Sequence, residues 1–166
     1  SQDYDQIQQA KEWLLNLNSN VKAYALPADV RDSMIRNEAA IAYMYSGNIV
    51  QAMEENDKIR LALNNEKVSL SMDTFVILKG TKHKTEAELF LNFLLRPEIS
   101  AKLIEQFPYV CFNKAAADYL PENLANSPLV VLTDDLKNRI YMYNTFDGDG
   151  ITYGIEAMTE VKTARG

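Results

Sequence analysis

The chain has 166 residues, of which 47% are hydrophobic and 24% charged, with a formal net charge of −6. This composition is typical of a globular domain, and the negative charge argues against nucleic acid or an anionic membrane as the main partner. No apolar run approaches the roughly 20 residues that a membrane-spanning helix needs. Because the chain begins at Ser1 rather than Met, we expect a processed product or a piece of a longer protein.

The first part of the chain alternates predicted helices with predicted short strands. Ile7, Ala10 and Leu14 recur at helical spacing, which predicts an amphipathic first helix. Asp29 is expected to cap a short helix, and the apolar run "AAIAYMYSG" predicts a buried strand that ends at Gly47. The expected order is helix 5–16, strand 21–26, a helix after Asp29, strand 39–47, helix 48–56 and strand 59–63.

The stretch "LSMDTFVILK" at residues 70–79 is predicted to be a strand buried on both faces, with Asp73 as a polar interruption. A helix with a broad apolar face is expected at 85–95, and it stops before Pro97, which begins a second helix to about Gln106. After Phe112 the sequence predicts short helices and turns, a loop over 120–130, and a last helix near 153–162.

Strands that are apolar throughout and alternate with helices indicate an α/β fold with a mainly parallel sheet. In such sheets ligands bind just outside the carboxyl ends of the strands. Tyr45 lies at one predicted strand end, Asp73 interrupts another strand, and Tyr109 follows a helix. Aromatic faces and a carboxylate together favour an ammonium ligand. The alternative is structural, with Tyr45 and Tyr109 in the core and Asp73 capping a turn.

The residues predict neither an enzyme nor a metal centre. One cysteine, Cys111, and one histidine, His83, make a catalytic dyad or a zinc site improbable, and apolar neighbours favour a buried, inert thiol. The "DGDG" stretch at 147–150 lacks the acid ladder of a calcium loop and is expected to be a turn. The adjacent Asp134 and Asp135 are expected to cap a helix. We therefore expect no catalytic residues and no cofactor.

Two stretches carry a family resemblance: "RNEAAIAYMYSGNIVQA" and "SLSMDTFVILKGTKHKTEAELFLNFLLRPEISAKLIEQFPYVCFNKAA". They resemble the extracellular solute-binding proteins of polyamine ABC transporters, with the spermidine/putrescine-binding type as the nearest. The resemblance runs from about Tyr24 to the end of the chain. It implies a type II, periplasmic-binding-protein-like fold in which two α/β lobes close on a linear polyamine.

The resemblance also implies a ligand-binding role for five residues. Tyr45 stands where an aromatic ring stacks on the aliphatic chain, and Asp73 stands where an acid binds an ammonium group. Tyr109 matches a second aromatic wall, and Asn48 matches a polar position just past a strand. Ser71 stands where better-known members carry a tryptophan, so one stacking wall is missing. The tail around residues 142–144 departs from the family pattern.

Members of this family are longer than this chain, so the resemblance implies a carboxyl-terminal fragment with pieces of both lobes. Residues 1–71 are expected to complete the second lobe, 72–117 to hold the hinge strand and the return to the first lobe, and 118–166 to cross back to the second lobe. Exposed sheet edges and helix faces in such a fragment favour a homo-oligomer.

The implied partners are a polyamine such as spermidine or putrescine and an ABC transporter permease. The implied location is the periplasmic or extracellular face of the bacterial cytoplasmic membrane, in some members with a lipoprotein anchor. Two alternatives stay open: a binding protein for another small solute, such as an amino acid or another cation, and a structural or interaction module. An anion binder would need basic residues where Tyr45, Asn48, Ser71 and Asp73 stand.

Overall fold

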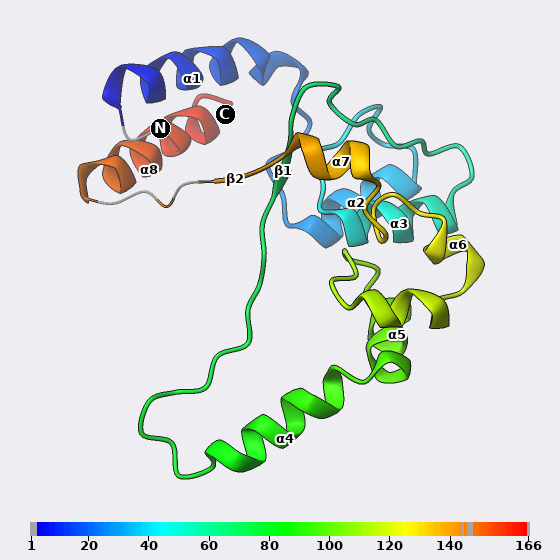
Figure 1. The fold of residues 1–166 in the computed structure, drawn as a ribbon. Helices are drawn as coiled ribbons and strands as arrows, with labels where there is room; N and C mark the ends of the chain where they lie inside the picture. Colours follow the sequence, from blue (N-terminus) through cyan, green and yellow to red (C-terminus); the bar gives the residue numbers. More distant parts are fainter. Residues whose placement is uncertain (1–2, 144, 146–147, 166) are drawn as a thin grey trace. The chain divides into compact units, whose positions relative to one another are not determined.

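The structure is a computed structural model that describes residues 3–143, 145 and 148–165. It divides into two compact units. The terminal unit holds Ser1–Leu26 and Met142–Gly166, and the central unit holds Pro27–Tyr141. Figure 1 shows the ribbon coloured along the chain. This division differs from the predicted lobe boundaries at residues 71 and 117, which concern a larger two-lobe protein and stay a prediction.

The terminal unit is a pair of helices, α1 (Tyr4–Leu17) and α8 (Gly148–Thr163), that pack side by side (Figure 1). Asp3 caps α1, because its Oδ1 atom accepts hydrogen bonds from the backbone N–H groups of Asp5 and Gln6 at 2.9 and 3.2 Å. The short 3-10 helix η1 (Asn18–Asn20) follows. The first and last helices are confirmed, although α8 begins five residues earlier than predicted.

Polar contacts join the two helices of the terminal unit across their packed faces. Lys11 Nζ lies 2.7 Å from Glu160 Oε2, and this hydrogen bond raises the pKa of the Lys11 ammonium above its usual value. Asn18 Nδ2 donates to the carbonyl oxygen of Val161 at 2.7 Å. Ile7 and Val161 are buried between the helices, so the predicted apolar stripe of the first helix does face a partner.

The central unit contains most of the helices, strand β1 and the first two residues of β2. The apolar cluster at its centre joins Val50 to Leu124, Leu129 and Val130. Cys111 packs against this cluster as a half-buried residue, and its N–H donates to the Val130 carbonyl at 2.8 Å. The helices are α2 (Pro27–Ile35), α3 (Ser46–Glu55), α4 (Lys84–Leu94), α5 (Pro97–Gln106), η2 (Lys114–Tyr119), α6 (Glu122–Ala125) and α7 (Asp134–Arg139).

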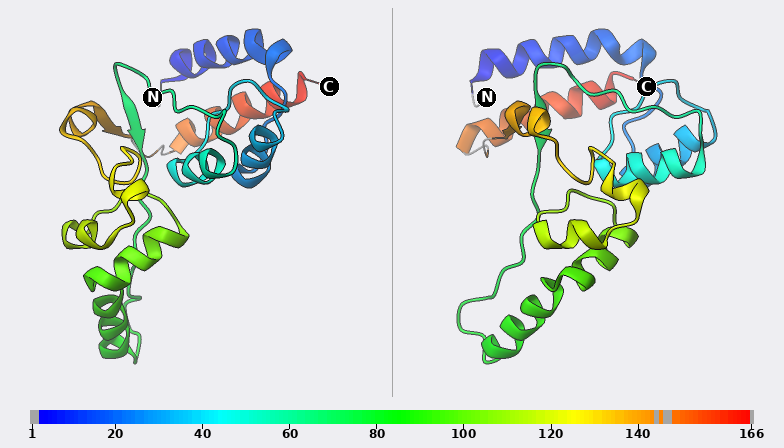
Figure 2. Two further views of the ribbon diagram at one scale, coloured as in Figure 1. Left: turned by 90° about the vertical axis from the view of Figure 1, so that its right-hand side faces the viewer. Right: turned by 45° about the vertical axis from the view of Figure 1, so that its right-hand side comes forward.

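The helix predictions hold for α3, α4 and α5, and Pro97 begins α5 as expected. Figure 2 shows the change of direction between α4 and α5. The predicted loop 120–130 is wrong in part, because it contains α6 and supplies Leu124 and Val130 to the core. Asp29 is also not a cap, since α2 begins at Pro27 and places Asp29 in its first turn.

Two acids expected to cap a helix have a different role. Thr133 caps α7 by accepting a hydrogen bond from the Leu136 N–H at 3.3 Å, and Asp134 and Asp135 lie in the first turn. Lys137 donates to Asp134 at 2.8 Å, which lowers the pKa of the Asp134 carboxyl. The acids therefore support the helix through its dipole and through ion pairing.

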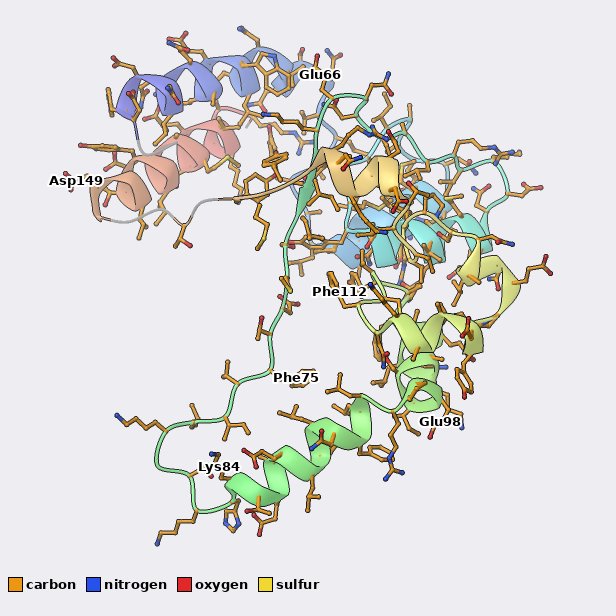
Figure 3. All side chains as sticks on the ribbon, viewed as in Figure 1. Glu66, Phe75, Lys84, Glu98, Phe112 and Asp149 are labelled. Carbon is orange, nitrogen blue, oxygen red and sulfur yellow. The ribbon has the colours of Figure 1, made fainter. Side chains whose placement is uncertain are left out.

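The strand predictions are largely wrong for this chain. The described residues form one two-stranded sheet, from β1 (Val68–Leu70) and β2 (Ile140–Met142). The segments 21–26, 39–45, 59–63 and 71–78 have no regular structure. Ile41 is 91% exposed and Phe75, labelled in Figure 3, is 73% exposed. A buried strand needs hydrogen-bonding neighbours and cover on its faces, and the described part of the chain supplies only β2.

The apolar face of α4 has little cover as well. Leu89, Phe90, Phe93 and Leu95 are all exposed. Segment 71–78 also carries exposed apolar side chains, and we call residues 71–95 the apolar arm. Exposed apolar side chains in such number are typical of a region that binds another surface rather than of an isolated domain.

Candidate functional site

Tyr45 and Asn48 lie at the N-terminal end of α3. Tyr45 is the N-cap residue, its side chain makes no capping hydrogen bond, and it is 57% exposed. Asn48 lies in the first turn, and its Oδ1 atom is buried with no hydrogen-bond partner among the described residues. A buried acceptor without a partner costs free energy, so this amide is an unfavourable feature of the first turn of α3.

Tyr109 reaches the same helix end from another part of the chain. Its ring lies against Gly47, because a Cβ atom built on Gly47 would be 2.9 Å from Cζ of Tyr109. Tyr109 follows α5, and its side chain is 45% exposed. The predicted aromatic pair Tyr45 and Tyr109 therefore flanks Gly47, and neither tyrosine is a core residue in this chain.

Ser71 and Asp73 follow β1 and are both exposed. The Asp73 carboxylate makes no hydrogen bond or ion pair with the residues that the structure describes, so the alternative role of Asp73 as a turn cap receives no support. A hydrogen bond of 3.0 Å between Tyr43 Oη and Ser69 Oγ links the segment before Tyr45 to β1. No contact in the described part of the chain places Ser71 or Asp73 beside Tyr45, Asn48 or Tyr109.

Gly47 is the residue that sequence reasoning missed. The sequence predicts Gly47 as the end of strand 39–47, whereas the glycine lies buried in the first turn of α3 and contacts the Tyr109 ring. A glycine inside a helix is a signal of close approach by another group, but the predicted helix begins only at residue 48. The identity of that group, 62 positions later in the chain, is not available from any local pattern.

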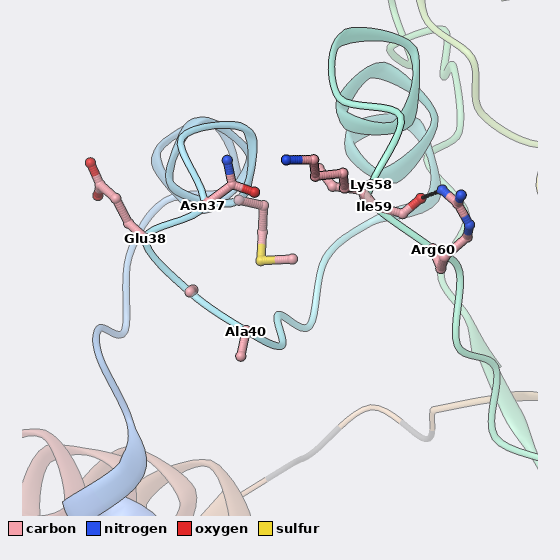
Figure 4. A pocket seen from close by; sticks show the side chains of 8 residues that line it. Asn37, Glu38, Ala40, Lys58, Ile59 and Arg60 are labelled. Carbon is pink, nitrogen blue, oxygen red and sulfur yellow. Dashed lines mark hydrogen bonds between the residues drawn. The ribbon is translucent and has the colours of Figure 1, made fainter.

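A pocket of about 520 Å³ lies elsewhere in the central unit (Figure 4). It is lined by the end of α2 and the segments around residues 37–40 and 58–60, and none of the five predicted site residues lines it. Its charged side chains are of both signs, with Glu38 opposite Lys58 and Arg60. The Arg60 guanidinium donates to the carbonyl of Ile59 at 2.9 Å. This mixed lining favours neither a cation nor an anion.

Several other expectations concern metals, membranes and the tail. Among the described residues, no group of three or more His, Cys, Asp or Glu side chains is placed to hold a metal ion. In the same part of the chain no helix is long and apolar enough to cross a membrane. Asp147 of the "DGDG" stretch and Asn144 of the departing tail lie outside the described residues, while Met142 ends β2.

Comparisons with known proteins identify the family. Residues 1–132 match the family model described as bacterial extracellular solute-binding protein. The chain is 25% identical over 165 residues to the putrescine-binding periplasmic protein PotF of Escherichia coli K12, covering 94% of this chain and 44% of PotF. It is 27% identical over 124 residues to the spermidine/putrescine-binding periplasmic protein of Salmonella typhimurium LT2, covering 75% of this chain and 35% of that protein.

A solved structure gives the fold. The chain superposes on the spermidine/putrescine ABC transporter substrate-binding protein PotD of Streptococcus pneumoniae with a TM-score of 0.82 and 27% identity, covering all of this chain and 51% of PotD. The predicted type II binding-protein fold is thereby confirmed. The chain spans less than half the length of the curated relatives, which agrees with the expected fragment.

The family description and the names of the relatives bear on the remaining expectations. They are the descriptions of solute-binding proteins outside the cytoplasm, not of enzymes, as the expectations have it. The lipoprotein anchor, the permease, the homo-oligomer and the five ligand-binding residues stay predictions. The chain belongs to the family of bacterial extracellular solute-binding proteins.

Proposed function

We propose that the protein is the substrate-binding component of an ABC importer and captures a linear polyamine, such as putrescine or spermidine. The observation that carries the proposal is the pair of exposed tyrosines, Tyr45 and Tyr109, at the N-terminal end of α3. Relatives of the chain are named for putrescine and spermidine. The tyrosine rings pack against the methylene chain of the solute, and the Asp73 carboxylate binds an ammonium group.

The charges near α3 support different roles for the tyrosines and for Asp73. The N-terminal end of a helix carries a partial positive charge, and the first turn of α3 contains no acid that would offset it. An ammonium group is therefore disfavoured directly at the helix end, where the tyrosines instead receive the apolar part of the solute. Asp73 is the one acid among the five predicted site residues, so it binds the cationic end.

The same helix end favours one alternative solute. A carboxylate is stabilised at a helix N-terminus, so an amino acid with its carboxylate at α3 and its ammonium group at Asp73 would satisfy both charges. In that arrangement the tyrosines pack against the side chain of the amino acid. A screen that includes amino acids beside polyamines distinguishes the two solute classes.

The proposal includes the rest of a two-lobe protein and a permease. In the full-length protein, residues 1–71 complete the second lobe, residues 72–117 hold the hinge strand and the return to the first lobe, and residues 118–166 cross back to the second lobe. The apolar arm supports this assignment, because Phe75, Leu78 and Phe90 are exposed and need cover. A second copy of the chain is the competing occupant of this surface, and the molecular mass of the full-length protein in solution distinguishes the two.

A thermal-shift screen of the full-length protein tests the proposed function. Putrescine and spermidine are expected to raise the melting temperature, because a ligand at 100 times its Kd stabilises the native state by about 2.7 kcal/mol. A diol of the same chain length as putrescine is the matched control, and it is expected to produce no shift since it lacks the ammonium groups. The absence of a shift with every polyamine, or a shift with amino acids alone, would contradict the proposal.

Truncation of Tyr45 is expected to weaken polyamine binding by about two- to fivefold, because the ring loses its contact with the methylene chain and one buried CH₂ group contributes about 0.8 kcal/mol. Tyr45→Phe keeps the ring and is expected to bind nearly as tightly as the wild type. Tyr119→Ala is the matched control, since Tyr119 is also 57% exposed. Calorimetric titration of the full-length variants measures the effect, and equal losses for Tyr45→Ala and Tyr119→Ala would refute a role for Tyr45.

A further inference from the structure

Gly47 leaves space that the Tyr109 ring occupies. A Cβ atom at Gly47 would lie 2.9 Å from Cζ of Tyr109, closer than real Cβ contacts, and 3.0 Å from both Cε atoms, which is tighter than most real contacts. The backbone itself does not require glycine, because the positive-φ glycines of the described residues are Gly80 and Gly148. Glycine is less favourable than alanine inside a helix, so the contact with Tyr109 is the physical reason for glycine here.

The backbone around Tyr109 holds the ring in this place. Pro108 before it is buried, and the Tyr109 N–H donates to the Phe107 carbonyl at 2.7 Å. Two residues later the Cys111 N–H donates to the carbonyl of Val130, which is fully buried in the core. The atoms that a side chain at position 47 would meet are at the far end of the Tyr109 side chain, so the ring is the group that moves to make room for it.

We propose that Gly47 is a positioning residue of the solute site: it allows the Tyr109 ring to lie against the first turn of α3, beside Tyr45. This inference rests on the proposed function, because it assigns the ring to the wall of the solute site. Gly47 contacts the ring and acts on the solute only through it. Any side chain at position 47 displaces the Tyr109 ring from that wall and lowers the affinity for the solute.

A double-mutant cycle in the full-length protein tests the contact without ligand. Gly47→Ala alone is expected to lower the midpoint of urea denaturation, because the added Cβ overlaps the ring. In a Tyr109→Ala background the same change is expected to raise the midpoint, because alanine is the better helix former. Gly154→Ala is the matched control: Gly154 also lies in a helix, α8, and a Cβ there meets nothing within 4 Å.

A second cycle, read by calorimetric titration with spermidine, tests the effect on binding. Gly47→Ala is expected to lower the affinity on the order of fivefold, and to have no further effect when Tyr109 is already alanine. Recovery of folding in the double variant would support the contact even if Gly47→Ala alone does not fold.

The two cycles separate the inference from the proposed function. If the wild-type protein binds no polyamine, the proposed function is wrong. The denaturation cycle still decides whether Gly47 positions the Tyr109 ring. The inference is overturned if Gly47→Ala changes stability as Gly154→Ala does. It is also overturned if the effect of Gly47→Ala, on stability or on affinity, is the same with and without the Tyr109 ring.

Discussion

Replacement of Asp73 by asparagine is expected to weaken polyamine binding by about ten- to a hundredfold. The change keeps the shape of the side chain but removes the charge that binds an ammonium group, and hydrogen bonds to charged groups contribute about 1.5–3 kcal/mol. The fold is expected to remain intact. Asp73 is exposed, and its carboxylate holds no other described residue through a hydrogen bond or ion pair.

Calorimetric titration of the full-length protein with spermidine and putrescine measures this effect, with circular dichroism to verify folding. Asp118→Asn is the matched control, because Asp118 is also an exposed acid and its replacement changes the net charge equally. The control variant is expected to bind like the wild type. A folded Asp73→Asn variant with wild-type affinity would show that Asp73 does not bind the solute.

Truncation of Leu124 to alanine is expected to lower the free energy of unfolding by about 2–5 kcal/mol. Leu124 is 4% exposed and packs with Val50, Leu129 and Val130 in the core of the central unit. Its truncation removes buried apolar surface and leaves a cavity that the surrounding side chains fill only in part.

Urea denaturation followed by circular dichroism measures the loss. Leu26→Ala is the control, since Leu26 is 71% exposed and substitutions of exposed side chains usually change stability by less than about 0.5 kcal/mol. Similar midpoints for the Leu124→Ala and Leu26→Ala variants would mean that the cluster around Val130 is not the core of the central unit.

The helices could be predicted because their signals are local. Apolar spacing around Ile7 predicts α1, and Pro97 separates α4 from α5 since it disfavours helical backbone in the residue before it and suits the first turn of a helix. Each of these signals acts within a few residues along the chain. These signals therefore identify the helices without knowledge of the elements that pack against them.

The strands could not be predicted in the same way, because a strand exists only when another strand pairs with it. The apolar runs at 39–45 and 71–78 have the composition of buried strands but belong to no sheet in the part of the chain that the structure describes. Conversely, β2 (Ile140–Met142) follows a short helix and is only three residues long, which is too short for an apolar pattern to identify it. Its pairing with β1, about 70 residues earlier, is a non-local contact.

Part of the candidate site could be predicted from the sequence and part could not. Family resemblance supplied Tyr45, Asn48 and Tyr109, and the structure brings these three to one helix end. The contact that joins them is made by Gly47, whose importance lies in the side chain that it lacks. Only coordinates reveal such a contact, because it depends on the distance between a backbone and a ring from remote parts of the chain.

The helix pair of the terminal unit has a consequence for synthesis. About 130 residues separate the end of α1 at Leu17 from the start of α8 at Gly148. At a translation rate of about 5–20 residues per second, α1 leaves the ribosome roughly 7–26 seconds before α8 is made. During that interval the apolar stripe around Ile7 has no α8 to cover it. The first helix of the chain to emerge is thus among the last to acquire its packing partner, and chaperones can bind it in the meantime.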